Sequence, residues 1–178
     1  MNAAGVALVL FAVFGVLGFG WRSWLQYRRT GSSGFRGISG GATEWIAGAG
    51  FAVALAVAVS APILQLYNVV APLSALSPVW IQIAGIAIAV AGIAATVYAQ
   101  LQMGDSWRIG VDEREHTPLV HTGVFGRVRN PIYTAMFAFG LGIALVTPNP
   151  VACTGFILLV ITIELQVRRV EEPHLSRT

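Results

Sequence analysis

The amino-acid sequence predicts an all-α integral membrane protein with about five transmembrane helices. Hydrophobic residues make up 56% of the 178 residues and charged residues only 11%, whereas ordinary soluble domains carry about 25% charged residues. The apolar residues form five long runs without the polar–apolar alternation of a barrel strand. Because only a helix satisfies its backbone hydrogen bonds within one such run, each run is expected to be helical.

The five apolar runs differ in length. A helix needs about 20 residues to cross the hydrocarbon core, and the second and third runs meet this requirement comfortably. The first run is adequate. Since no positive charge precedes it, we expect a retained helix rather than a cleaved signal peptide. The runs comprise residues 3–19, 45–66, 79–101, 132–146 and 151–167.

The fourth and fifth runs are short, and only residues 147–150 separate them. Their sequence, Thr-Pro-Asn-Pro, is a strong turn signal. We therefore expect a tight helical hairpin that just reaches across the membrane. Small residues at four-residue spacing allow helices to approach closely in lipid. Such pairs, Gly85 with Ala89 and Gly140 with Ala144, predict close packing within one bundle.

The basic residues predict the orientation. All eleven are arginines, and they fall between the first and second runs, between the third and fourth, and after the fifth. Residues 67–78 and 147–150 carry none. With five crossings, every arginine lies on one side, which the positive-inside rule makes cytoplasmic. The N-terminus is then outside and the C-terminus inside. The Gly- and Ser-rich residues 30–41 are expected to form a mobile cytoplasmic loop.

Polar chemistry is concentrated in residues 103–133. Near the end of this stretch, Asn130 suits a helix N-cap and Pro131 suits the first helical position. The start of a helix also presents free N–H groups and a partial positive charge to an anion. A structural cap and a ligand-binding role both stay open for Asn130.

Acidic residues at the end of the last run form a second polar feature. Glu164 lies inside an apolar segment, where a carboxylate is unfavourable unless it is paired. Arg168 follows four residues later and Glu171 seven, so the three share one helical stripe. We favour a structural Glu164–Arg168 ion pair over direct chemistry for Glu164. Glu171 and Glu172 oppose the helix dipole, which calls for a compensating arginine or a cationic ligand.

Several functional classes are excluded by composition and motif. The arginines are not interleaved with aromatic platforms, so nucleic acid is not an expected partner. One cysteine precludes an internal disulfide, and three scattered histidines predict no metal site. The sequence contains no Ser/His/Asp set, no phosphate-binding loop and no dinucleotide fingerprint in a soluble context.

Three motifs follow one another in the C-terminal half of the chain. They read Leu119-Val120-His121-Thr122-Gly123-Val124-Phe125, then Arg129-Asn130-Pro131-Ile132-Tyr133, and finally Glu171-Glu172. In this order they resemble the membrane methyltransferases typified by isoprenylcysteine carboxyl methyltransferase and its bacterial relatives. The resemblance covers about residues 98–175. Asn130 stands where that family has histidine, so a titratable imidazole is lost but a hydrogen-bonding role survives. Pro118 is an extra residue between His116 and Leu119.

The resemblance implies that S-adenosylmethionine binds in a cytosol-facing pocket, roofed by residues 103–130, in a bacterial inner or plasma membrane. One membrane domain, 1–178, would comprise a three-helix part, 1–101, and a catalytic part, 102–178. By matched position, the adenosine end would be lined by His116, Leu119, Val120, Gly123 and Phe125. The donor's polar groups would be reached by Arg129, Asn130 and Tyr133, and the site would be closed by Glu171 and Glu172.

The expected reaction is methyl transfer to a lipophilic or amphiphilic acceptor that enters from the bilayer, so membrane lipids are expected partners. An acceptor carboxylate or thiolate would be held by an arginine such as Arg129 or Arg168. An acceptor amine would lose its proton to Glu164 or Glu171. The alternatives are an NADPH-dependent membrane sterol or enone reductase-like enzyme and a non-enzymatic small membrane scaffold.

Overall fold

The computed structural model describes residues 2–35, 42–107, 123–126, 128 and 130–168, and these residues form helices and no strand. The predicted all-helical class is thereby confirmed. The helices are α1 (Ala3–Gly15), α2 (Arg22–Thr30), α3 (Ala42–Leu66), α4 (Val79–Gln102), α5 (Pro131–Val146) and α6 (Pro150–Gln166). A π-helical stretch, Val16–Trp21, joins α1 to α2, and single 3₁₀ turns occupy Ser74–Leu76, Gly104–Ser106 and Gly123–Gly126.

Three helical segments in the described ranges are long and apolar enough to cross a membrane. They are Ala3–Thr30, Trp45–Leu66 and Val79–Gln102, with 28, 22 and 24 residues, and about 20 are needed. Helices α5 and α6 are apolar but shorter, with 16 and 17 residues, as the sequence predicts.

The first helix is longer than predicted. The apolar run ends at Phe19, but the backbone stays helical to Thr30 and stops at Gly31, whose φ of 74° is left-handed. Within the π-helical stretch, the carbonyl of Gly18 accepts a hydrogen bond of 2.9 Å from Nε2 of Gln100 on α4. The side chain of Gln100 thus reaches the backbone of the first helical segment at this irregular turn.

The arginines that follow the first apolar run therefore lie on a helix rather than in a loop. Arg22, Arg28 and Arg29 all belong to α2. The predicted mobile loop, 30–41, is described only as far as Phe35, and there Gly34 packs against the ring of Trp107. Residues 36–41 lie outside the described part of the chain.

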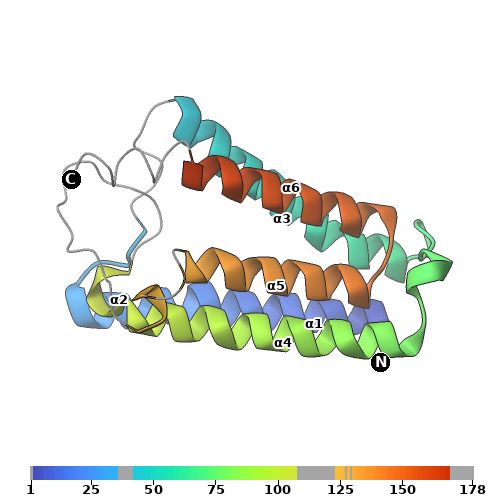
Figure 1. Cartoon of the computed structure of the whole chain (residues 1–178), viewed down its shortest axis with the longest axis horizontal. Coiled ribbons are helices and arrows are strands. Elements are labelled where there is room, and N and C mark those ends of the chain that lie inside the picture. The colour runs from blue at the N-terminus through green and yellow to red at the C-terminus, as the bar shows by residue number, and fades with distance from the viewer. Residues whose placement is uncertain (1, 36–41, 108–122, 127, 129, 169–178) are drawn as a thin grey trace.

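Figure 1 shows two layers, one made of α1, α4 and α5 and the other of α3 and α6. Helix α4 packs extensively along α5, and α3 packs extensively along α6. The contact between α5 and α6 is much less extensive. The short turn predicted between them is present, but the two helices lie in different layers and do not form a closely packed hairpin.

The turn is held by Asn149, which is fully buried. Its side chain accepts a hydrogen bond from the backbone N–H of Ala152 at 2.9 Å and so caps α6. The same amide donates to the carbonyl of Ala61 at 3.2 Å and to Oε1 of Gln65 at 2.9 Å, both on α3. These bonds tie the start of α6 to the end of α3 and so keep these two helices in one layer.

Glycines bring α4 and α5 into backbone contact. A Cβ atom on Gly142 would lie 2.5 Å from the backbone nitrogen of Ala89, and one on Gly92 would lie 2.5 Å from that of Phe139. Gly85 is equally restricted by the carbonyl of Gly142. The predicted packing role of Gly85 and Ala89 is thus confirmed. Gly140 faces the other layer, where its nearest neighbour is the side chain of Leu159.

We expect Gly142→Ala to lower the melting temperature of the protein in detergent, because the added methyl group would overlap the backbone of α4. Overpacking of this kind costs about 1–3 kcal/mol. Gly15→Ala is the matched control, since a Cβ there meets nothing within 4 Å. The control should melt at the wild-type temperature or slightly above it. Equal melting temperatures for the two variants would contradict the α4–α5 contact.

Candidate functional site

The chain connections gather at the two ends of the bundle. Helices α1 and α2 run in one direction as a continuous segment, and α3, α4, α5 and α6 then alternate in direction (Figure 1). The ends of α2, α4 and α6 and the starts of α3 and α5 therefore lie together at one end, the first end of the bundle. The N-terminus lies at the other end, where the backbone N–H of Leu73 donates to the carbonyl of Pro148 at 2.6 Å. Among the described arginines, Arg22, Arg28, Arg29 and Arg168 all belong to the first end.

The predicted site residues divide into two groups. The structure describes Gly123, Phe125, Asn130, Tyr133, Glu164 and Arg168. Six others lie outside the described residues, namely His116, Leu119, Val120, Arg129, Glu171 and Glu172.

Gly123 opens a short 3₁₀ turn beside the end of α4. Its φ is 64°, and a Cβ atom at this position would lie 2.6 Å from Oε1 of Gln102. The positive φ favours glycine at this position, whereas the Gln102 side chain could move aside for a Cβ atom. The turn places the half-buried Phe125 near the end of α4, so Trp107 and Gly123, the described residues on either side of 108–122, both lie in this region.

Asn130 occupies the N-cap position of α5 and Pro131 the first helical position, as predicted. The side chain of Asn130, however, makes no capping hydrogen bond. Its backbone carbonyl alone serves the helix, accepting bonds of 3.0 Å from the backbone N–H and the hydroxyl of Thr134. The side-chain amide is thus not used by the helix, which favours the ligand-binding interpretation. Tyr133 lies one turn further along and is half-buried.

Glu164 and Arg168 form the predicted ion pair. Nε of Arg168 donates to Oε2 of Glu164 at 2.7 Å. The Glu164 side chain is 46% exposed and the Arg168 side chain 73%. An exposed pair of this kind contributes little to stability. Glu164 lies in the last turn of α6 and Arg168 two residues beyond its end. Figure 1 shows the end of α6 at the same end of the bundle as the start of α5, where Asn130 is the N-cap, but in the other layer.

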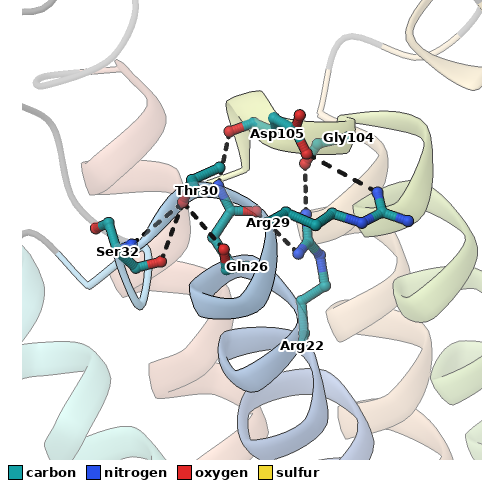
Figure 2. Close-up of polar contacts among 7 residues, drawn as sticks. All are labelled: Arg22, Gln26, Arg29, Thr30, Ser32, Gly104 and Asp105. Carbon is teal, nitrogen blue, oxygen red and sulfur yellow. Dashed lines mark hydrogen bonds and ion pairs between the residues drawn. The ribbon is translucent and has the colours of Figure 1, made fainter.

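A polar cluster that sequence reasoning missed centres on Arg22. Its side chain is buried with 1% exposure, and it donates to Oε1 of Gln26 at 3.0 Å and to the carbonyl of Gly104 at 2.5 Å. Figure 2 shows these bonds and the bond of 2.7 Å from Nε2 of Gln26 to the carbonyl of Asp105. The four-residue spacing of Arg22 and Gln26 was the available signal, but the predicted end of the helix at Phe19 concealed it.

An apolar cleft separates the two layers. Its volume is about 40 Å³, so the side chains of the two layers leave only a small space between them. Leu55, one of the residues that line the cleft, is 40% exposed, so part of the lining faces the surface of the bundle. Its lining is apolar and includes Phe11, Phe14, Phe19, Phe51, Phe139 and Phe156.

Metal ligands do not cluster in the part of the chain that the structure describes. No group of three or more His, Cys, Asp or Glu side chains lies together there. The absence of a metal site from the whole protein stays a prediction.

We expect Asn130→Ala to change the free energy of unfolding by less than about 0.5 kcal/mol, as is usual away from caps and cores. Asn149→Ala should lower it by about 1–2 kcal/mol, because the true cap of α6 is lost. Denaturant or thermal unfolding in detergent would measure both. A larger loss in Asn130→Ala than in Asn149→Ala would show that Asn130 is a structural cap.

Comparison with known proteins gives one finding. The model of the phospholipid methyltransferase family matches residues 80–178, which is more than half of the chain and includes every predicted site residue. Neither the curated proteins nor the solved structures gave a match. The chain therefore belongs to the phospholipid methyltransferase family, within the isoprenylcysteine carboxyl methyltransferase-like group of membrane methyltransferases.

Proposed function

We propose that this membrane methyltransferase transfers the methyl group of S-adenosylmethionine to a lipophilic or amphiphilic acceptor that enters from the bilayer. The family match over residues 80–178 carries the proposal. It favours methyl transfer over both alternatives, the reductase and the scaffold, and three helices of membrane-spanning length support an acceptor taken from lipid.

The residues of the three sequence motifs fit the chemistry of this donor. S-Adenosylmethionine carries a carboxylate, an ammonium group and a sulfonium cation. The carboxylate would suit the N-terminus of α5 and the side-chain amide of Asn130, which makes no capping bond to that helix. The glutamates of the third motif, Glu171 and Glu172, suit the cationic groups. Gly123 lets the backbone come close to its neighbours, as a tight binding turn requires.

The proposed donor-binding set follows the three motifs. The adenosine end would contact His116, Leu119, Val120, Gly123 and Phe125. The polar end would contact Arg129, Asn130, Tyr133, Glu171 and Glu172.

The apolar cleft supports access of the acceptor from the bilayer. It lies between α1 and α5 on one side and α3 and α6 on the other, and no charged residue lines it. A hydrocarbon chain that displaced the phenylalanine rings would remain in apolar surroundings, while its polar head lay toward an end of the bundle. The helices α5 and α6, which border the cleft, also carry Asn130 and Glu164.

Bound S-adenosylmethionine supplies a methyl group already activated by the sulfonium. The protein then has to align the acceptor with this group and exclude water. Arg129 or Arg168 would hold an acceptor carboxylate or thiolate. For an amine, Glu164 or Glu171 would take the proton. An acceptor carboxylate at Arg168 would compete with Glu164, which Arg168 already binds.

The site is proposed to face the cytoplasm, with the N-terminus on the opposite side of the membrane. Its support is the position of the described arginines, all at the end of the bundle that carries Asn130 and Glu164. The connection 67–78 at the other end has none. The positive-inside rule assigns the arginine-bearing end to the cytoplasm.

We expect S-adenosylhomocysteine to bind purified wild-type protein at one saturable site in isothermal titration. Asn130→Ala and Glu171→Gln should weaken binding by about tenfold or more, since a hydrogen bond to a charged group contributes about 1.5–3 kcal/mol. NADPH should not displace the ligand. Well-folded wild-type protein that binds NADPH but not S-adenosylhomocysteine would support the reductase alternative instead.

The acceptor class can be tested with three probes in lipid vesicles. Phosphatidylethanolamine offers an amine, farnesylcysteine a carboxylate and a long-chain alkyl thiol a sulfur, each with labelled S-adenosylmethionine. Leu55→Trp should raise the KM for the probe that wild-type protein methylates, because the indole would narrow the cleft, and should leave donor binding unchanged. Val53→Trp, at a residue that is 55% exposed and outside the cleft lining, should leave both unchanged. An unaltered KM in Leu55→Trp would refute acceptor access through this cleft.

A further inference from the structure

Arg22 is an unusual residue for its position. It lies in the helical segment Ala3–Thr30, one of the membrane-spanning candidates, and is 1% exposed. No acidic side chain in the described residues pairs with it, and its Nε atom has no hydrogen-bond partner. A buried cation is costly unless other polar groups replace its lost hydration. The groups that the Arg22 guanidinium binds should therefore explain why an arginine stands at this position.

Arg22 and Gln26 bind the chain just after α4. The Arg22 guanidinium donates to the carbonyl of Gly104, and the Gln26 amide donates to the carbonyl of Asp105, the next residue. Both side chains come from α2, and both carbonyls belong to the turn that ends α4 (Figure 2). We call these four residues, together with Trp107, the α2 clamp.

Trp107 packs its ring against the guanidinium of Arg22. The guanidinium carbon of Arg22 lies 4.6 Å from the centre of its ring, a favourable cation–π distance. The backbone of Gly34 also reaches this ring, since a Cβ atom on Gly34 would lie 2.8 Å from Cζ3 of Trp107. The ring is 3% exposed. Trp107 is therefore fixed by α2 and by the residues that follow α2.

Trp107 links the α2 clamp to the proposed donor-binding residues along the chain. Residues 108–122 follow it directly and carry three of the proposed donor-binding residues, His116, Leu119 and Val120. The described chain resumes after this segment at Gly123, which lies against the side chain of Gln102 on α4. Arg22 and Gln26 lie outside the matched family region, which begins at residue 80. The first helical segment thus holds one end of a segment that belongs to the matched region.

We propose that Arg22 and Gln26 are positioning residues for the donor site. By fixing Gly104, Asp105 and Trp107 at the end of α4, they increase the fraction of molecules in which the donor site is competent to bind its ligand. The apparent dissociation constant of a ligand equals its intrinsic value divided by this fraction. The inference rests on the proposed S-adenosylmethionine-dependent function.

The test compares Arg22→Met and Gln26→Leu with Asn149→Ala in the full-length protein. Asn149→Ala removes hydrogen bonds at the opposite end of the bundle and controls for general loss of stability. In each clamp variant, the Kd for S-adenosylhomocysteine and the KM for S-adenosylmethionine should rise about tenfold, as when the competent fraction falls to about one tenth. The kcat at saturating donor should stay within about twofold of wild type. Asn149→Ala should melt earlier but bind S-adenosylhomocysteine with the wild-type Kd.

Hydrogen exchange without ligand gives an independent readout. The backbone amides of Ser106 and Trp107 should exchange faster in the clamp variants than in wild type or Asn149→Ala. If Arg22→Met does not fold, Gln26→Leu alone decides.

A wild-type Kd in a folded clamp variant would overturn the inference, and so would equal weakening by Asn149→Ala. Wild-type protein that does not bind S-adenosylhomocysteine would instead count against the proposed function, while faster exchange would still reveal the clamp.

Discussion

Backbone contact between α4 and α5 is the constraint on which the rest of the structure depends. Gly85, Gly92 and Gly142 let the two helices approach until a single added methyl group would overlap backbone atoms. Apolar side chains give no net advantage over lipid tails inside a membrane, so close packing of this kind supplies much of the association. The contact also sets the site: it brings the end of α4 beside the start of α5, so that the turn at Gly104, the turn at Gly123 and the N-cap Asn130 belong to one region.

The two-layer arrangement separates two chemical environments. One end of the bundle carries the described arginines, the N-cap residue Asn130 and the Glu164–Arg168 pair. The interior between the layers is apolar and is lined by aromatic rings. Among them, the ring of Phe14 stacks on that of Phe139 with centroids 4.2 Å apart. In a methyltransferase that takes its acceptor from lipid, the acceptor's chain and the donor's charges need these two environments side by side. The splayed α5 and α6 border both, which a closely packed hairpin would not allow.

The first helical segment has a part in this arrangement that its apolar sequence does not suggest. Phe11 and Phe14 pack on Phe139 of α5, and the polar end of the segment binds the turn after α4. The π-helical stretch between these two parts exposes the Gly18 carbonyl to Gln100. One helical segment therefore contacts the apolar core along α1 and, through α2, the turn that precedes the proposed donor-binding segment.

The sequence by itself determined the helical class, the membrane-spanning length of three segments, the turn before α6 and the family. Each rests on local information: run length, turn residues, or motifs in fixed order. The Glu164–Arg168 pair was also predictable, because four-residue spacing places both side chains on one helical face. Only the tertiary structure decided the placement of Arg22, the assignment of α5 and α6 to different layers, and the lack of a capping bond from the Asn130 side chain. They depend on contacts between residues distant in sequence, such as Arg22 with Gly104 and Asn149 with Ala61. No local pattern of hydrophobicity or spacing encodes contacts over such separations.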